Sequence, residues 1–383
     1  MHTHQHDEQF MRLALKLARR GQGRTRANPL VGAVIVDNGH ILATGWHRAW
    51  GKAHAEIDAL NAARKAGHHD LSLATLYVNL EPCCHQGKTP PCTGAIIRAG
   101  IGTVVCGMED PNPLVRGKGM SELRAAGIHI RSGICETECR ELNHPFIRYM
   151  ETGLPSITLK TASSLDGKIA TETGASRWIS CEQSRAEVHR LRSRSDAVLT
   201  GLGTIRADNP LLTARVSGQS CSPQPVRIII DSRLQIPPES AILATALQFK
   251  TIIAVRRDLV EHADADFLNR MRMATEAGAE VLPVNQKDGH IDLVCLARLL
   301  ADRGFLSILL EAGNTLGNAA LHAGIVDRVR MYIAPIIIGS NEAPSVCGDK
   351  GAITIQSAWR LHRTRYRRCG TDIVVEGTLC SPE

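Results

Sequence analysis

The chain has 383 residues, of which 43% are hydrophobic and 22% charged, an ordinary composition for a folded globular protein. Its first residues are polar and it carries no stretch of about 18 apolar residues, so we expect neither a secretory leader nor a membrane span. We therefore expect a cytoplasmic protein whose 12 cysteines are free thiols outside any metal site. The net charge of +7 suits a phosphorylated substrate or cofactor, although a solvated surface explains it equally well.

The first 150 residues alternate between helical and strand patterns. Apolar residues at helical spacing predict helices, and short runs of β-branched residues between turn signals predict strands. The expected helices cover residues 8–20, 54–66, 93–99, 123–127 and 135–149. The expected strands cover residues 28–36, 41–46, 74–80 and 102–107. This alternation predicts a three-layer α/β unit.

The stretch from His54 to Cys92 has the composition of a zinc site. Zinc in proteins takes imidazole and thiolate ligands, and His54, Cys83 and Cys92 supply three, which leaves one position for water. Glu56 is not needed as a ligand, and a carboxylate beside that water can move its proton. We therefore expect one zinc ion per chain and hydrolytic deamination with Glu56 as the proton carrier. A structural zinc knot remains the alternative, with Cys84 or His85 as the fourth ligand.

The residues around this expected zinc site resemble those of a known family. The His54-Ala55-Glu56 and Pro82-Cys83 segments resemble the cytidine-deaminase-like zinc signature, H-x-E followed by P-C-x-x-C. Here eight residues separate Cys83 from Cys92, and the longer pattern from Pro82 to Cys92 resembles the deaminase half of the bacterial bifunctional riboflavin-biosynthesis deaminase–reductases. The insertion contains Gly87, Lys88 and Thr89, which could contact and recognise a substrate.

The resemblance also places other residues near the deaminase substrate. It implies that Asn28, His85 and the loop from Asp110 to Pro113 lie at the mouth of the zinc site. A turn asparagine is the alternative for Asn28, and loop packing is an equal alternative for His85. Cys84 is expected to be a small packed residue.

A boundary follows at Glu151–Pro155, and it divides the chain into expected domains at residues 1–150 and 155–383. After it, the strand and helix patterns resume without repeating the first half. The first expected strand begins at Ser156, and further strands are expected at 196–201, 225–231, 250–255 and 306–310, with helices at 181–194 and 316–323. The basic run at residues 360–368 predicts a solvated edge strand rather than a nucleic-acid patch.

The turn Gly313-Asn314-Thr315-Leu316-Gly317 lies between a strand and a helix, where exposed N–H groups bind phosphate well. It does not match the G-x-G-x-x-G fingerprint of dinucleotide-binding proteins. Its spacing alone favours an ordinary strand–turn–helix connection that binds no ligand. Four segments taken together, namely Leu-Asp-Gly, Trp-Ile-Ser, Ala-Asp-Asn-Pro and Glu-Ala-Gly, resemble the reductase half of the same riboflavin enzymes. That resemblance implies a fold similar to dihydrofolate reductase over residues 155–377.

The resemblance assigns roles in this second domain position by position. An NADPH site is implied, lined by Ala162, Trp178, Thr204 and Asp208, with the Gly313–Gly317 turn holding cofactor phosphate. The phosphorylated substrate is implied to contact Ser176, Arg192, Leu212, Arg215 and Glu311. Lys160 and Asp166 are expected in the same cleft, Lys160 as a substrate contact, and the role of Asp166 is left open.

The sequence therefore predicts a cytidine-deaminase-like domain followed by a dihydrofolate-reductase-like domain in a bifunctional enzyme of riboflavin synthesis. By resemblance, it deaminates 2,5-diamino-6-(5-phosphoribosylamino)pyrimidin-4(3H)-one and reduces the ribosyl group with NADPH to give 5-amino-6-(5-phosphoribitylamino)uracil. We expect a homo-oligomer and no nucleic-acid or membrane partner. Two rivals are a nucleic-acid or nucleoside deaminase and a zinc-stabilised binding protein without catalysis. Few aromatic residues are available to stack bases, which disfavours the first rival.

Overall fold

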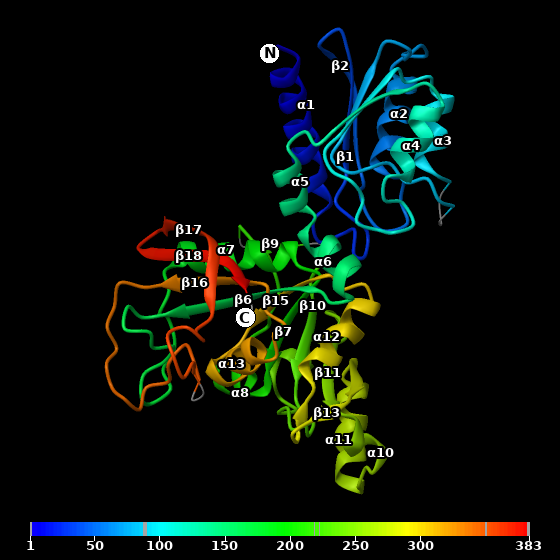
Figure 1. The fold of residues 1–383 in the computed structure, drawn as a ribbon. Helices are drawn as coiled ribbons and strands as arrows, with labels where there is room; N and C mark the ends of the chain where they lie inside the picture. The colour runs from blue at the N-terminus through cyan, green and yellow to red at the C-terminus, as the bar shows by residue number, and fades with distance from the viewer. Residues whose placement is uncertain (1, 87–89, 218, 222, 349–350, 381–383) are drawn as a thin grey trace. The chain divides into compact units, whose positions relative to one another are not determined.

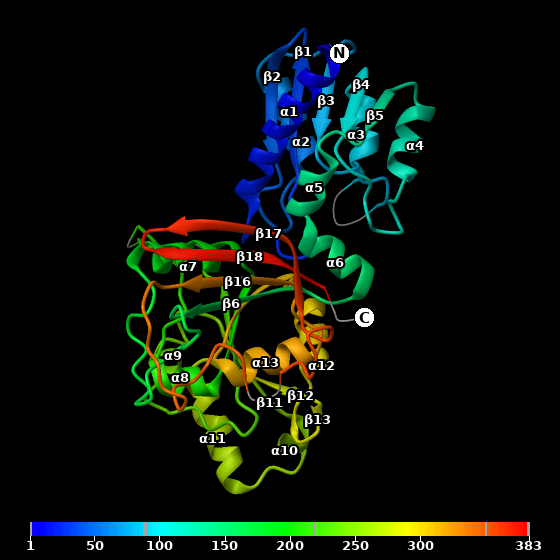
Figure 2. The ribbon, with the colours of Figure 1, turned by 60° about the vertical axis from the view of Figure 1, so that its left-hand side comes forward.

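The computed structural model describes residues 2–86, 90–217, 219–221, 223–348 and 351–380. The chain divides into two compact units, Met1–Gly153 and Leu154–Glu383. Both are visible in Figure 1 and, turned by 60°, in Figure 2.

Unit 1 is built on a five-stranded sheet in the order β2-β1-β3-β4-β5. Strand β1 pairs antiparallel with β2 and β3, whereas β3, β4 and β5 run parallel. The strands are β1 (Gly32–Asp37), β2 (His40–Trp46), β3 (Thr75–Val78), β4 (Thr103–Cys106) and β5 (His129–Ser132). The helices are α1 (His2–Ala18), the 3-10 turn η1 (Arg19–Gly21), α2 (Ala55–Lys65), α3 (Cys92–Arg98), α4 (Lys118–Ala125), α5 (Glu136–Leu142) and α6 (His144–Thr152).

Two glycines let helices approach opposite faces of this sheet. A Cβ on Gly32 would collide with the Ala14 carbonyl of α1, and one on Gly45 would collide with the Ala55 carbonyl of α2. Gly45 pairs with Ala33, the neighbour of Gly32, and successive strand residues point to opposite faces. Helices α1 and α2 therefore cover different faces, which produces the three layers (Figure 2).

The structure departs from the expected elements of unit 1 in several places, since helix α1 begins at His2 rather than at residue 8 and strand β1 at Gly32 rather than at residue 28. The single helix expected over 135–149 is wrong, because α5 and α6 are separated at Asn143. The Asn143 side chain is bonded to the Leu30 backbone, with its Oδ1 2.8 Å from the Leu30 N and its Nδ2 3.1 Å from the Leu30 O. Helix α4 begins at Lys118 rather than Leu123, and strand β5 was not expected.

Unit 2 is built on a nine-stranded sheet in the order β12-β11-β10-β7-β15-β6-β16-β18-β17. The seven strands from β12 to β16 are parallel, and β18 and β17 are added antiparallel. Its strands are β6 (Ser156–Ser163), β7 (Ala197–Gly201), β10 (Val226–Ile230), β11 (Thr251–Arg256), β12 (Ala279–Val284), β15 (Ser307–Glu311), β16 (Arg328–Ile333), β17 (Arg360–Cys369) and β18 (Asp372–Cys380). Two small hairpins are β8 (Arg215–Val216) with β9 (Gln219–Ser220), and β13 (Gln286–Lys287) with β14 (His290–Ile291).

Helices cover the parallel part of this sheet on both faces, so its strands are buried on both sides. Leu199 faces a core that includes residues of α12 and α13, whereas the preceding Val198 faces a core that includes residues of α11. The helices are α7 (Glu182–Arg194), α8 (Leu202–Asp208), α9 (Ala241–Ala244), α10 (Arg257–Glu261), α11 (Ala265–Glu276), α12 (Leu293–Asp302) and α13 (Asn314–His322).

The basic strand expected at residues 360–368 is confirmed as β17, which pairs with β18 at the edge of the sheet (Figure 1). Helix α8 was not expected. Helix α13 begins at Asn314, two residues before the expected start, so most of the glycine-containing turn belongs to the helix.

Candidate active sites

The three expected zinc ligands lie together in unit 1. The Nδ1 atom of His54 lies 3.5 Å from the Cys83 sulfur and 3.3 Å from the Cys92 sulfur. Zinc bonds of about 2.0 Å to nitrogen and about 2.3 Å to sulfur, meeting at a tetrahedral angle, would separate those ligand atoms by about 3.5 Å. The observed distances therefore fit one tetrahedral zinc ion. Within the described part of the chain, this trio is the cluster able to hold a metal.

Local structure explains how the trio assembles. His54 precedes the first residue of α2 and has an extended backbone, so its ring lies at the start of the helix. Cys92 begins α3, and its backbone N–H points at the Cys83 sulfur at 3.4 Å. Cys84 does not belong to the cluster of ligand atoms, and its sulfur lies 4.0 Å from the Leu114 carbonyl oxygen instead. The fourth ligand of a structural knot is therefore not supplied by Cys84.

Glu56 lies in the first turn of α2 and is buried. Burial raises the pKa of its carboxyl to about 7, close to the pH at which a proton carrier works best. Hydrogen bonds from Cys92 and His54 hold the pKa of Cys83 below its ordinary value, which favours the thiolate form that binds metal.

A cavity of about 330 Å³ opens beside these residues. We call it the N-terminal cavity, and its lining includes Asn28, His47, Glu56, Cys83, His85 and Asp110. The Nδ2 atom of Asn28 lies 3.0 Å from the His47 Nε2, and the His47 Nδ1 lies 3.0 Å from the Ala53 carbonyl oxygen. The Nδ1 atom of His85 is buried and has no hydrogen-bond partner among the residues that the structure describes. Residues 87–89 lie outside the described residues.

The loop after β4 forms another wall of the N-terminal cavity, and Glu81 holds it in place. Glu81 is buried, and its carboxylate accepts backbone N–H groups from Asp110, Gly117 and Met120 at 3.0–3.2 Å. Burial raises the pKa of Asp110 to about 6. Sequence reasoning missed Glu81 and His47, although Glu81 is adjacent to the Pro82-Cys83 motif.

A second cavity, of about 640 Å³, lies in unit 2, and we call it the C-terminal cavity. Eleven residues expected from the sequence line it. They are Lys160, Ala162, Ser176, Trp178, Arg192, Thr204, Asp208, Leu212, Arg215, Glu311 and Gly313. The expected residues Asn314, Thr315, Leu316 and Gly317 follow in the first turn of α13. Asp166 does not line the cavity, because its carboxylate accepts the backbone N–H groups of Ile338 and Gly339.

Polar pairs fix several side chains of the C-terminal cavity. The Ser176 hydroxyl donates to the Asp208 carboxylate at 2.8 Å. Arg215 lines the cavity, and its Nη1 donates to the Thr213 hydroxyl at 2.8 Å, while the residue as a whole is exposed.

Lys160 has a pKa below its ordinary value because it is buried, although Glu311 opposes that shift. Sequence reasoning missed Arg185 and His189, which line the C-terminal cavity from α7. Their helical spacing relative to Arg192 was the available signal, since residues three and four apart share a helix face.

No described helix is long and apolar enough to cross a membrane.

Two family models match the chain. Residues 4–108 match the cytidine and deoxycytidylate deaminase zinc-binding region, and residues 155–375 match the RibD C-terminal domain. The expected order of a deaminase-like domain followed by a dihydrofolate-reductase-like domain is confirmed.

Curated relatives match over nearly the whole chain. Riboflavin biosynthesis protein RibD of Actinobacillus pleuropneumoniae is 40% identical over 98% of this chain and 96% of its own length. The Escherichia coli protein of that name is also 40% identical, over 96% of this chain and 98% of its own length.

Solved structures of RibD proteins superpose on nearly the whole chain. The Thermotoga maritima diaminohydroxyphosphoribosylaminopyrimidine deaminase/5-amino-6-(5-phosphoribosylamino)uracil reductase superposes with a TM-score of 0.84 at 34% identity, covering 99% of this chain and 100% of that one. Acinetobacter baumannii RibD superposes with a TM-score of 0.83 at 33% identity over the same shares. The chain therefore belongs to the RibD family of bifunctional riboflavin-biosynthesis enzymes, which combine a zinc-dependent deaminase with a reductase.

Proposed function

We propose that this chain deaminates 2,5-diamino-6-(5-phosphoribosylamino)pyrimidin-4(3H)-one and then reduces the product with NADPH to 5-amino-6-(5-phosphoribitylamino)uracil. The observation that carries the proposal is the presence of both cavities with their expected residues in a member of this family. The solved Thermotoga maritima relative has this pair of substrates in its name.

In the deaminase reaction, water replaces the 2-amino group and ammonia leaves. When bound by His54, Cys83 and Cys92, zinc supplies a Lewis acid that makes water acidic near pH 7. Glu56 accepts a proton from the attacking water and delivers it to the departing amine, because its buried carboxyl exchanges protons near neutral pH. Asn28, held by His47, contacts the pyrimidine, and so does the Nδ1 of His85, which is buried without a partner in the described part of the chain.

In the reductase reaction, a hydride adds to the sugar C1′, the C1′–O4′ bond breaks, and O4′ takes up a proton. NADPH supplies the hydride. Ala162, Trp178, Thr204 and Asp208 bind the cofactor, and the first turn of α13 from Gly313 to Gly317 holds its phosphate, since helix N-termini favour anions.

The remaining residues of the C-terminal cavity bind the substrate. Lys160 holds the proton for O4′, and Glu311 orients the sugar hydroxyls. Arg215 binds the substrate phosphate, whereas Arg192 supports Glu311. Ser176 and Leu212 complete the wall.

Two further parts of the proposal concern the whole molecule. The described cysteines are free thiols, which supports a cytoplasmic location. Within the described residues β17 is the outermost strand of its sheet, and an edge strand can pair with a second copy, which supports a homo-oligomer.

The test is to incubate the zinc-loaded protein with the diaminopyrimidine phosphate, with and without NADPH, while following ammonia release and NADPH absorbance. We expect ammonia in both samples and loss of NADPH only where it is supplied. Glu56→Gln should lose about 10²–10⁴-fold in ammonia release while retaining zinc. It should still oxidise NADPH with the already deaminated substrate. Near-normal ammonia release from zinc-loaded Glu56→Gln would contradict the role of Glu56.

A further inference from the structure

A row of charged residues crosses the sheet of unit 2 behind the C-terminal cavity. Lys160 on β6 lies opposite Glu311 on β15 and opposite Arg330 on β16. Arg330 in turn lies opposite Glu376 on β18. Because register partners point to the same face, two cations, Lys160 and Arg330, are neighbours in this row. An uncompensated Arg330 would repel the Lys160 ammonium.

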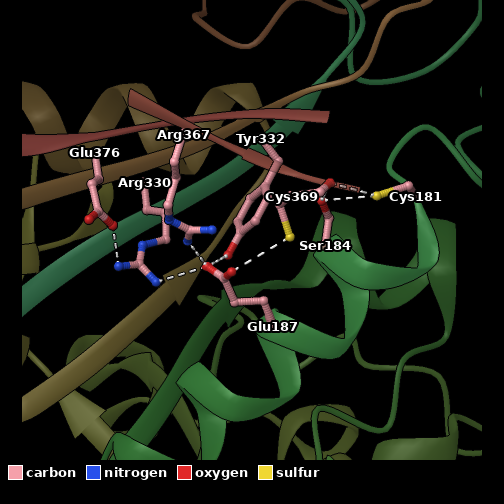
Figure 3. Close-up of polar contacts among 8 residues, drawn as sticks. All are labelled: Cys181, Ser184, Glu187, Arg330, Tyr332, Arg367, Cys369 and Glu376. Carbon is pink, nitrogen blue, oxygen red and sulfur yellow. Dashed lines mark hydrogen bonds and ion pairs between the residues drawn. The ribbon is translucent and has the colours of Figure 1, made fainter. Parts of the chain in front are cut away.

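Glu187, on α7 and outside the cavity lining, compensates Arg330. Its carboxylate accepts the Arg330 Nη1 at 3.2 Å, the Tyr332 hydroxyl at 2.9 Å, and a bond from Arg367 (Figure 3). The other end of the Arg330 guanidinium donates to Glu376. The Glu187 side chain is only 13% exposed and that of Arg330 22%, so solvent screens this cluster weakly.

Tyr332 links this cluster to the cavity. Its side chain is fully buried and packs with Val188 and Ala162, both of which line the C-terminal cavity. The centre of its ring lies 6.0 Å from the Lys160 ammonium nitrogen. The hydroxyl bond to Glu187 (Figure 3) therefore helps to fix the orientation of the ring, which lies next to Lys160.

The charges around Lys160 come from every element packed against it. The negative groups are Glu311 on β15 and Asp208 on α8. The positive or titratable groups are Arg185, His189 and Arg192 on α7, and Arg330 and Tyr332 on β16. Arg177, before α7, and Arg215, on β8, line the same cavity. Since Glu311 is already bonded to Arg192, no other described group balances Arg330 from the α7 side.

We propose that Glu187 is a positioning residue for the reductase, which balances Arg330 and orients Tyr332 so that Lys160 keeps its proton and its place in the cavity. This inference rests on the proposed role of Lys160 in the reductase reaction. It adds a residue that touches neither substrate nor cofactor and acts through its neighbours.

The test measures kcat for NADPH oxidation against pH, with the deaminated substrate at saturation. In Glu187→Gln, Arg330 and Arg367 are left with the single carboxylate of Glu376, and the excess positive charge disfavours the charged form of Lys160. The alkaline limb of the profile should therefore move down by about one pH unit, a tenfold loss on that limb. Tyr332→Phe keeps the ring and loses only the bond to Glu187. The alkaline limb of its pH profile should therefore also move to lower pH, but by less than in Glu187→Gln. Glu187→Asp keeps the charge and should restore most of the wild-type profile.

Glu182→Gln is the matched control, because it makes the same change at an exposed position of the same helix. Its pH profile and the ammonia release of every variant should equal those of the wild type. An unmoved alkaline limb in folded Glu187→Gln and Tyr332→Phe overturns the proposal, even if the melting temperature or the KM for NADPH changes. If Glu187→Gln does not fold, the pH profile of Tyr332→Phe alone decides whether the proposal holds. A wild-type protein that does not oxidise NADPH refutes the proposed reductase function itself.

Discussion

Arg192 on α7 binds both carboxylate oxygens of Glu311 on β15, with 2.6 Å from Nε to Oε1 and 2.9 Å from Nη2 to Oε2. The third nitrogen, Nη1, donates to the Thr213 carbonyl at 3.1 Å. Burial alone would raise the pKa of Glu311, but the Arg192 charge holds it below its ordinary value. Most donors of Arg192 are therefore committed to keeping Glu311 ionised and fixed in the C-terminal cavity.

We predict that Arg192→Lys impairs reduction. A lysine cannot reproduce the two-point bond, and losing a hydrogen bond to a charged group costs about 1.5–3 kcal/mol. This corresponds to a roughly 10- to 100-fold fall in kcat/KM for NADPH oxidation. Arg190→Lys, at an exposed position of the same helix, is the control. Full reductase activity in Arg192→Lys would show that the pair is dispensable.

We predict that Cys92→Ser loses zinc and that Cys84→Ser keeps it. Cys92 is buried with its sulfur 3.3 Å from the His54 Nδ1, whereas the Cys84 sulfur lies outside the ligand cluster. Elemental analysis of the purified variants measures zinc per chain. A full complement of zinc in Cys92→Ser, or none in Cys84→Ser, would reject the ligand set.

We predict that Asp110→Asn stabilises the protein at pH 8 but not near pH 4. Burial raises the Asp110 pKa from 3.8 to about 6, so the native state prefers the protonated form. The ionised carboxylate therefore costs stability above pH 6, on the order of 3 kcal/mol, and this cost disappears as the pH falls towards the unfolded pKa. Asparagine retains the Oδ1 that accepts the Asn112 N–H.

The measurement is the urea midpoint of the zinc-loaded protein at several pH values. Glu109→Gln, at the exposed neighbouring position, should follow the wild type throughout. A pH-independent difference between Asp110→Asn and the wild type would mean that the carboxyl does not titrate in this range.

We predict that Arg227→Lys lowers stability without affecting deamination. Arg227 is fully buried on β10. Its guanidinium donates to Thr245, Thr251 and the carbonyl oxygens of Leu211, Ile242 and Phe249. Lysine has three donors and would leave some acceptors unpaired, at a cost of about 3 kcal/mol.

Thermal melting is the measurement, and Arg233→Lys at an exposed position is the control. An Arg227→Lys melting temperature equal to that of the control would mean that the site readily repacks around the smaller cation.

The sequence by itself determined the features that depend on short spacing. The His54-x-Glu56 segment and the Pro82–Cys92 segment predicted the zinc cluster, because a helix start and a strand end leave few arrangements for those side chains. Alternating helix and strand patterns predicted the three layers of unit 1, and the basic alternation at residues 360–368 predicted the edge strand β17.

Only the tertiary structure decided features that depend on partners distant in the chain. Asn143 looked helical, but its bonds to Leu30, 113 residues away, separate α5 from α6. The sequence pattern singled out neither Arg227 nor Glu187. The partners of these two side chains lie on segments that approach them only in the folded protein. A buried charge there needs a hydrogen-bonding partner because water is absent. The local sequence pattern carries no information about contacts between residues that are distant in the chain, so the burial and pairing of these side chains are known only from the structure.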